Sequence, residues 1–173
     1  MQKKFSYPLK IDELNQNTYK FILAADAAEC ADIAEVLQVE GVENFLAELR
    51  LKLNLREHLL KVWGTVKARL LLKSVISLEN FAQDYTVPFT LYFDTQATYR
   101  DIKAMGGGIN AEVPDIIENG MINLADIAIE QIALQIDDYP RAPGEVFDYA
   151  AYSTEPVAEV KENPFAVLQK LKK

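Results

Sequence analysis

The sequence has few of the residues that catalysis most often uses. It contains one cysteine, Cys30, and one histidine, His58, in 173 residues. His58 falls at a predicted strand turn, where a solvated role is ordinary, and Cys30 falls on the apolar stripe of a predicted helix. No H-E-x-x-H motif and no nucleophile elbow is present. We therefore expect no catalytic residue, no metal site and no cofactor, and we do not expect an enzyme.

Three carboxylates could in principle serve acid–base chemistry or bind a cation. Asp137, Asp138 and Glu145 lie near the end of a predicted helix. Carboxylates beside a turn at a helix end are more often solvated. We therefore expect these carboxylates to be solvated and not catalytic.

Long apolar runs and an export signal are also lacking. No run approaches the ~18 residues that a membrane-spanning helix requires. The first residues include lysines but no following apolar segment. A lone cysteine cannot form an internal disulfide and fits a reducing compartment. We expect a cytoplasmic protein with no membrane partner, and its net charge of −8 argues against RNA binding through the whole surface.

Alternation of apolar and polar residues is the strongest pattern present. Apolar side chains occupy every second position from Phe45 to Leu55, and again from Leu60 to Leu72. Because successive side chains on a strand point to opposite faces, this predicts two half-buried strands of one long hairpin. A turn at Glu57 and His58 would place Leu55 opposite Leu60. The same register would place Lys52 opposite Trp63 and Glu48 opposite Lys67.

The polar face of this hairpin is mostly basic although the chain is acidic overall. Basic residues around an aromatic ring suit phosphate contact together with base stacking. The alternative is a solvated outer face, on which long basic side chains are ordinary. We predict a nucleic-acid-binding surface made of Arg50, Lys52, Lys61, Trp63, Lys67 and Arg69.

The remaining pattern predicts an α+β fold with an antiparallel sheet centred on the hairpin. Two helices, over residues 26–39 and 123–136, would pack on its apolar face. Residues 95–119 show no sustained period and are expected to form a long loop, closed by a short strand near residues 113–117. We expect one domain over residues 1–145. A flexible tail, residues 146–173, would follow with a short amphipathic helix near its end.

Three stretches carry a resemblance to a known family. They are Val62-Trp63-Gly64-Thr65-Val66-Lys67-Ala68, Ser74-Val75-Ile76-Ser77-Leu78-Glu79, and the segment from Gly120 to Gly144 that ends in Tyr139-Pro140-Arg141-Ala142-Pro143-Gly144. Their order resembles the YceD family, the large ribosomal RNA subunit accumulation proteins. The closing Asn163–Leu171 segment is also typical of it. One departure concerns Ser74 and Ser77, which stand where many members have cysteines; serine does not replace cysteine as a zinc ligand.

The resemblance implies a non-catalytic factor that supports accumulation of large-subunit ribosomal RNA. We expect it to bind that RNA or a pre-ribosomal particle. The alternative is an adaptor that binds a basic large-subunit ribosomal protein and does not contact RNA. Its contact residues would be Tyr139, Arg141, Phe165 and Leu168, although the turn around Arg141 also has a purely structural explanation.

Overall fold

The computed structural model describes residues 5–97 and 115–148. The chain divides into two units, residues 1–142 and 143–173, and the helices and strands that the structure describes all belong to the first. The predicted C-terminal helix with Phe165 and Leu168 lies outside the described residues, as does most of the predicted loop over residues 95–119. The division into a domain and a flexible tail stays a prediction.

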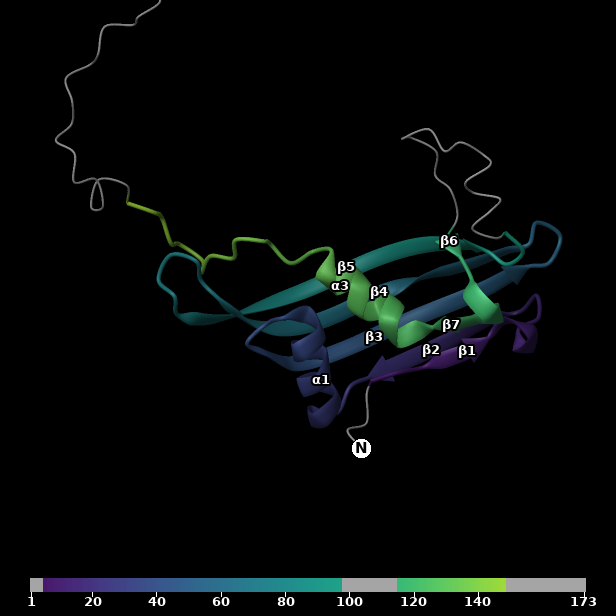
Figure 1. Ribbon diagram of the computed structural model, residues 1–173, viewed down its shortest axis with the longest axis horizontal. Coiled ribbons are helices and arrows are strands. Elements are labelled where there is room, and N and C mark those ends of the chain that lie inside the picture. Colours follow the sequence, from purple (N-terminus) through teal and green to yellow (C-terminus); the bar gives the residue numbers. More distant parts are fainter. Residues whose placement is uncertain (1–4, 98–114, 149–173) are drawn as a thin grey trace, which may run out of the picture. The chain divides into compact units, whose positions relative to one another are not determined.

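The architecture is α+β, with a mostly antiparallel sheet and two helices, which confirms the predicted class (Figure 1). The larger sheet has five strands in the order β2-β3-β4-β5-β6, and only the β5–β6 pair is parallel. Strands β1 and β7 form a separate antiparallel pair. The elements are β1 Pro8–Lys10, η1 Ile11–Glu13, β2 Thr18–Ala24, α1 Ala27–Leu37, β3 Gly41–Asn54, β4 Leu59–Lys73, β5 Asn80–Asp94, β6 Asp115–Ile116, η2 Glu118–Gly120, β7 Met121–Asn123 and α3 Leu124–Ala133.

Strands β3 and β4 pair in a register that differs from the predicted one by two residues. Leu53, not Leu55, lies opposite Leu60, and Lys52 lies opposite Lys61 instead of Trp63. The turn takes up Leu55–His58, so Leu55 is half exposed in it. A shift of two residues keeps every side chain on its predicted face, because the side-chain period of a strand is two.

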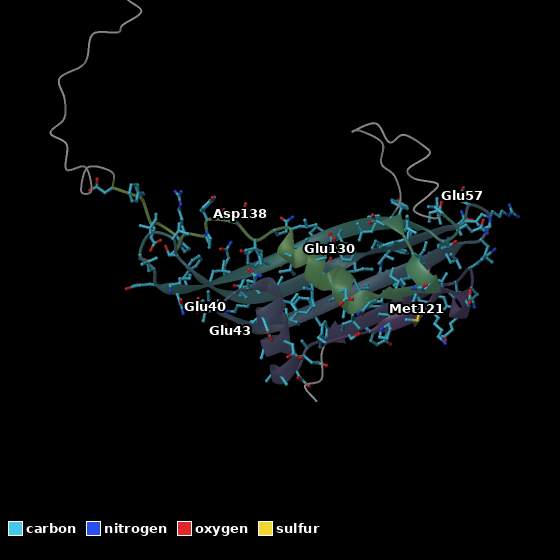
Figure 2. The ribbon with its side chains drawn as sticks, in the orientation of Figure 1. Glu40, Glu43, Glu57, Met121, Glu130 and Asp138 are labelled. Carbon is cyan, nitrogen blue, oxygen red and sulfur yellow. The ribbon has the colours of Figure 1, made fainter. Side chains whose placement is uncertain are left out.

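The core lies between the larger sheet and the two helices. Inward side chains of β3 and β4 such as Leu49, Leu51 and Val62 have no exposed surface. Both helices lie on this face of the sheet (Figure 1), and each contributes buried residues, Ile33 from α1 and Ile132 from α3. The opposite side of α3, where Glu130 lies, is exposed (Figure 2).

Both helices begin at a side-chain cap. The Asp26 carboxylate accepts a hydrogen bond from the Glu29 N–H at 2.9 Å, and the Glu29 carboxylate accepts one from the Asp26 N–H, which forms the predicted capping box. Asn123 caps α3 and accepts from the Ala125 N–H. The same Asn123 oxygen also accepts from the Tyr7 N–H at 2.8 Å. This cap therefore holds the N-terminal segment as well as the helix.

Gly64 of β4 lies tightly against the backbone of β3. A Cβ built on it would overlap the Glu48 carbonyl oxygen and stand 3.0 Å from the Leu49 Cα. Backbone atoms cannot yield as the end of a flexible side chain can, so only glycine fits at this position.

Candidate nucleic-acid interface

The outer face of the larger sheet carries two adjacent rows of residues with cations on three strands. One row runs Thr18–Lys52–Lys61–Tyr92, and the next runs Lys20–Arg50–Trp63–Thr90. Directly paired residues of antiparallel strands point to the same face. These rows contain no carboxylate. We call the side chains of Lys20, Arg50, Lys52, Lys61, Trp63 and Tyr92 the basic patch.

Like charges lie directly opposite each other twice in the basic patch. Lys20 pairs with Arg50 across β2 and β3, and Lys52 pairs with Lys61 across β3 and β4. Such pairs destabilise a sheet by a few tenths of a kcal/mol to about 1 kcal/mol. Glu48 offsets one of them, since its carboxylate lies 3.8 Å from the Lys20 ammonium, but both groups are half exposed and the pair contributes little. A bound polyanion would relieve this repulsion.

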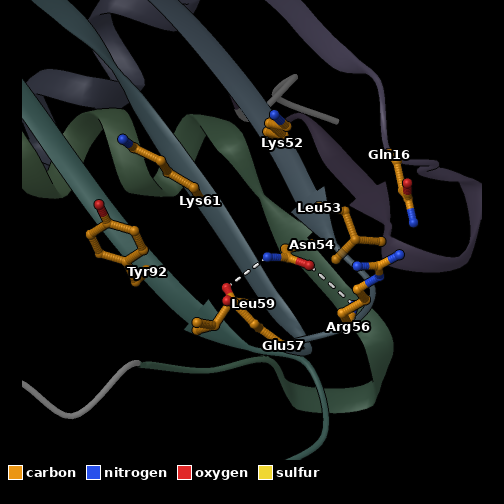
Figure 3. A pocket seen from close by; sticks show the side chains of 9 residues that line it. All are labelled: Gln16, Lys52, Leu53, Asn54, Arg56, Glu57, Leu59, Lys61 and Tyr92. Carbon is orange, nitrogen blue, oxygen red and sulfur yellow. Dashed lines mark hydrogen bonds between the residues drawn. The ribbon is translucent and has the colours of Figure 1, made fainter.

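The Lys61 ammonium lies between two aromatic rings. It is 5.3 Å from the centre of the Trp63 ring and 5.6 Å from that of Tyr92. Toward the hairpin turn, Lys52, Lys61 and Tyr92 line a surface hollow of about 470 Å³, to which Arg56 and Glu57 also contribute (Figure 3). The Glu57 carboxylate accepts a hydrogen bond from the Asn54 amide at 2.6 Å. The hollow thus combines cations, an aromatic ring and one carboxylate that already has a donor.

The two remaining predicted residues, Lys67 and Arg69, lie on the same face but further from the turn. Lys67 pairs with Leu46, not with Glu48, and lines a second hollow of about 310 Å³ that also touches Arg50 and Trp63. The Arg69 guanidinium bonds to Glu43 at 2.8 Å and to Asp84 at 3.2 Å. Its charge is therefore balanced within the fold.

Sequence reasoning missed Lys20 and Tyr92 as members of the surface. Lys20 lies between two inward-facing residues, Tyr19 and Phe21, and Tyr92 lies between Leu91 and Phe93. The alternation therefore predicts that Lys20 and Tyr92 point outward. The sequence does not predict the order of the strands in the sheet. Only that order brings β2 and β5 to either side of the predicted hairpin.

The turn after α3 is held by backbone contacts. The Asp137 carboxylate accepts from the Tyr139 N–H at 2.9 Å, and the Pro140 carbonyl accepts from the Val75 N–H at 2.9 Å. Tyr139 is 68% exposed, and no ion pair joins Arg141 to Asp137 or Asp138 in the described parts of the chain. Tyr139 and Arg141 are thus both exposed on this turn.

Asp137 also acts on a neighbouring side chain. Burial first, and then the Asp137 carboxylate, raise the pKa of the Tyr85 hydroxyl.

The segment Ser74–Glu79 forms a tight turn between β4 and β5. Ser74 is fully buried, and its hydroxyl oxygen accepts from the Ile76 N–H at 3.1 Å and from the Ser77 N–H at 3.3 Å. The Leu78 N–H donates to the Ser74 carbonyl, and Leu78 has a φ of 62°. Ser74 therefore closes this turn through hydrogen bonds to the backbone.

Cys30 and His58 occupy ordinary structural positions. Burial, followed by the Asp26 and Glu29 carboxylates, raises the pKa of the Cys30 thiol, so it stays in the weakly nucleophilic neutral form. His58 is exposed in the hairpin turn. Within residues 5–97 and 115–148, no three His, Cys, Asp or Glu side chains gather as metal ligands. Neither of the helices described is long and apolar enough to cross a membrane.

Comparison with known proteins gives one match. The family model described as "Large ribosomal RNA subunit accumulation protein YceD" matches residues 62–172. No curated protein and no solved structure matches the chain. The matched range begins in β4 at Val62, two residues before Gly64, and it includes the Ser74 turn, Asn123 and the Tyr139–Gly144 segment.

Proposed function

We propose that this chain, which belongs to the YceD family of large ribosomal RNA subunit accumulation proteins, supports the accumulation of large-subunit ribosomal RNA by binding RNA through the basic patch. The proposal is of a non-catalytic cytoplasmic factor whose partner is large-subunit ribosomal RNA or a pre-ribosomal particle. The family match supports the process, and the geometry of the sheet supports the mode of action.

The observation that carries the proposal is the pair of like-charge contacts, Lys20 with Arg50 and Lys52 with Lys61, in an acidic chain. Like charges in opposite register positions cost stability, and the exposed Lys20–Glu48 ion pair offsets only a small part of that cost. Phosphates of RNA would neutralise them and release counterions. Trp63 and Tyr92, beside the cations, offer faces on which unpaired bases can stack. The proposed ligand is therefore a single-stranded segment of ribosomal RNA.

Trp63 provides a direct test because it is the single tryptophan of the chain. We expect a single-stranded RNA oligonucleotide to change its fluorescence on binding. The logarithm of the affinity should fall with the logarithm of the salt concentration with a slope of about −3. The four cations of the basic patch would neutralise four phosphates, and each phosphate contributes about −0.7 to the slope. Titrations at several salt concentrations measure this slope.

Two outcomes of that titration would contradict the proposal. One is an unchanged Trp63 signal at RNA concentrations that saturate binding by another method, which would place the RNA elsewhere. The other is the absence of RNA binding at low salt, which would favour the adaptor that contacts a ribosomal protein. The adaptor keeps Tyr139 and Arg141 as its candidate contacts, with Phe165 and Leu168 outside the described residues.

A further inference from the structure

A second surface of different chemistry lies between the two helices. A groove of about 330 Å³ separates α1 and α3. Val36 and Leu37 line it from α1, and Ile129 and Ala133 line it from α3. This wall is mainly apolar. The groove belongs to the layer of α1 and α3, which lie on one face of the sheet (Figure 1). The register places the basic patch on the other face.

Carboxylates edge the groove. Asp126 and Glu130 contribute to its lining, and both are exposed. Figure 2 shows Glu130 on the outward side of α3. The two helices together contain five acidic residues and no lysine or arginine, the acidic ones being Glu29, Asp32, Glu35, Asp126 and Glu130. The groove is therefore apolar inside and negative at its edges.

One apolar side chain that lines this groove is largely exposed. Val36, in the last turn of α1, is 54% exposed. A partner that covers the groove would bury this side chain together with the apolar wall.

We propose that this groove binds a basic amphipathic helix of another protein. Apolar side chains of such a helix, spaced three and four residues apart, would enter between α1 and α3. Its lysines and arginines would lie near Asp126 and Glu130, and this charge complementarity selects the occupant. RNA is disfavoured because its phosphates would meet carboxylates. A second copy cannot supply such a basic helix from α1 or α3, the helices that the structure describes, because neither contains lysine or arginine.

This inference is independent of the RNA-binding proposal, since the two surfaces share no residue. Both surfaces together would let the protein hold RNA on the sheet and a basic protein segment on the helices. Loss of one activity should leave the other intact.

The test uses the full chain and two synthetic 18-residue probe helices. Both probes carry leucines on one face, and the other face carries lysines in the first probe and glutamates in the second. We expect the lysine probe to bind at least tenfold more tightly than the glutamate probe, with an affinity that falls as salt rises. Fluorescence anisotropy of labelled probes measures both affinities.

Substitutions then assign the binding to the groove. Val36→Lys together with Glu130→Lys should weaken the lysine probe at least tenfold. Ile22→Lys is the control for an apolar residue replaced by lysine, because Ile22 is 60% exposed on the outer face of the sheet and lies away from the groove. It should leave the affinity unchanged, and thermal melting should show all variants folded.

Three results would overturn the inference. They are equal binding of both probes, equal binding by the groove variant and the parent chain, and probe binding that Ile22→Lys reduces as strongly as the groove variant does. Self-association that the groove variant abolishes, without probe binding, would identify a second copy as the occupant and would also overturn it.

Discussion

Lys52→Glu is expected to stabilise the fold and to weaken RNA binding at the same time. Lys52 lies directly opposite Lys61, and glutamate there would turn a repulsive cross-strand pair into an attractive one. The gain in the free energy of unfolding should be about 0.5–1 kcal/mol, since each such pair contributes up to about 1 kcal/mol. Affinity for single-stranded RNA should fall at least tenfold, because a phosphate contact is replaced by repulsion.

Urea unfolding and the Trp63 titration measure the two effects on the same protein. A more stable variant that binds less tightly cannot owe its weaker binding to unfolding. Lys73→Glu is the matched control, since it makes the same change in net charge at the far end of β4, opposite Asn80. If Lys73→Glu weakens binding as much as Lys52→Glu does, net charge alone governs affinity and the basic patch is not the interface.

Gly64→Ala is expected to destabilise the protein by about 3 kcal/mol or more, the upper end of the range for overpacking. The added methyl group would meet the Glu48 carbonyl oxygen and the Leu49 Cα, which belong to the paired backbone of β3. Relief would require β3 and β4 to separate where the core side chains are fully buried. A loss of this size is a large fraction of a typical stability of about 5–15 kcal/mol.

The Gly41→Ala variant is the control for this substitution. A Cβ at Gly41 would stand 3.6 Å from the Leu71 Cβ, an ordinary contact, so its effect should stay within about 1 kcal/mol. Urea unfolding followed by Trp63 fluorescence compares the two variants. Equal stability of Gly64→Ala and Gly41→Ala would show that the strands do not approach as closely as described at Gly64.

The faces of the sheet could be predicted from sequence because they depend only on a period of two. The register of the hairpin could not, because it depends on the length of the turn. The Asn54 side chain accepts a hydrogen bond from the Arg56 N–H at 3.1 Å, and the turn begins directly after Asn54. The predicted turn began later, at Glu57. His58, with a φ of 54°, ends it. Asn54 itself was the available signal for this longer turn, because an asparagine side chain often accepts a hydrogen bond from the backbone N–H two residues on.

The charges of the predicted surface were harder to predict than its position. The six residues of the predicted nucleic-acid-binding surface do lie on one face of the sheet. The charged residues that pair with them depend on which strands lie beside the hairpin. Glu43 reaches Arg69 next to a register shift between Val42 and Asn44, and Asp84 reaches it from β5. Lys20 joins from β2 in the same way. Irregular pairing and strand order leave no local pattern in the sequence.

Site-specific photocrosslinking in cells tests the central proposal most directly. A photoreactive phenylalanine analogue replaces Tyr92, which is 47% exposed in the basic patch, and in a second variant replaces Val36 on the helical side. We expect crosslinks to large-subunit ribosomal RNA from position 92 and not from position 36. Crosslinks from position 92 to protein alone, or equal RNA crosslinking from both positions, would contradict it.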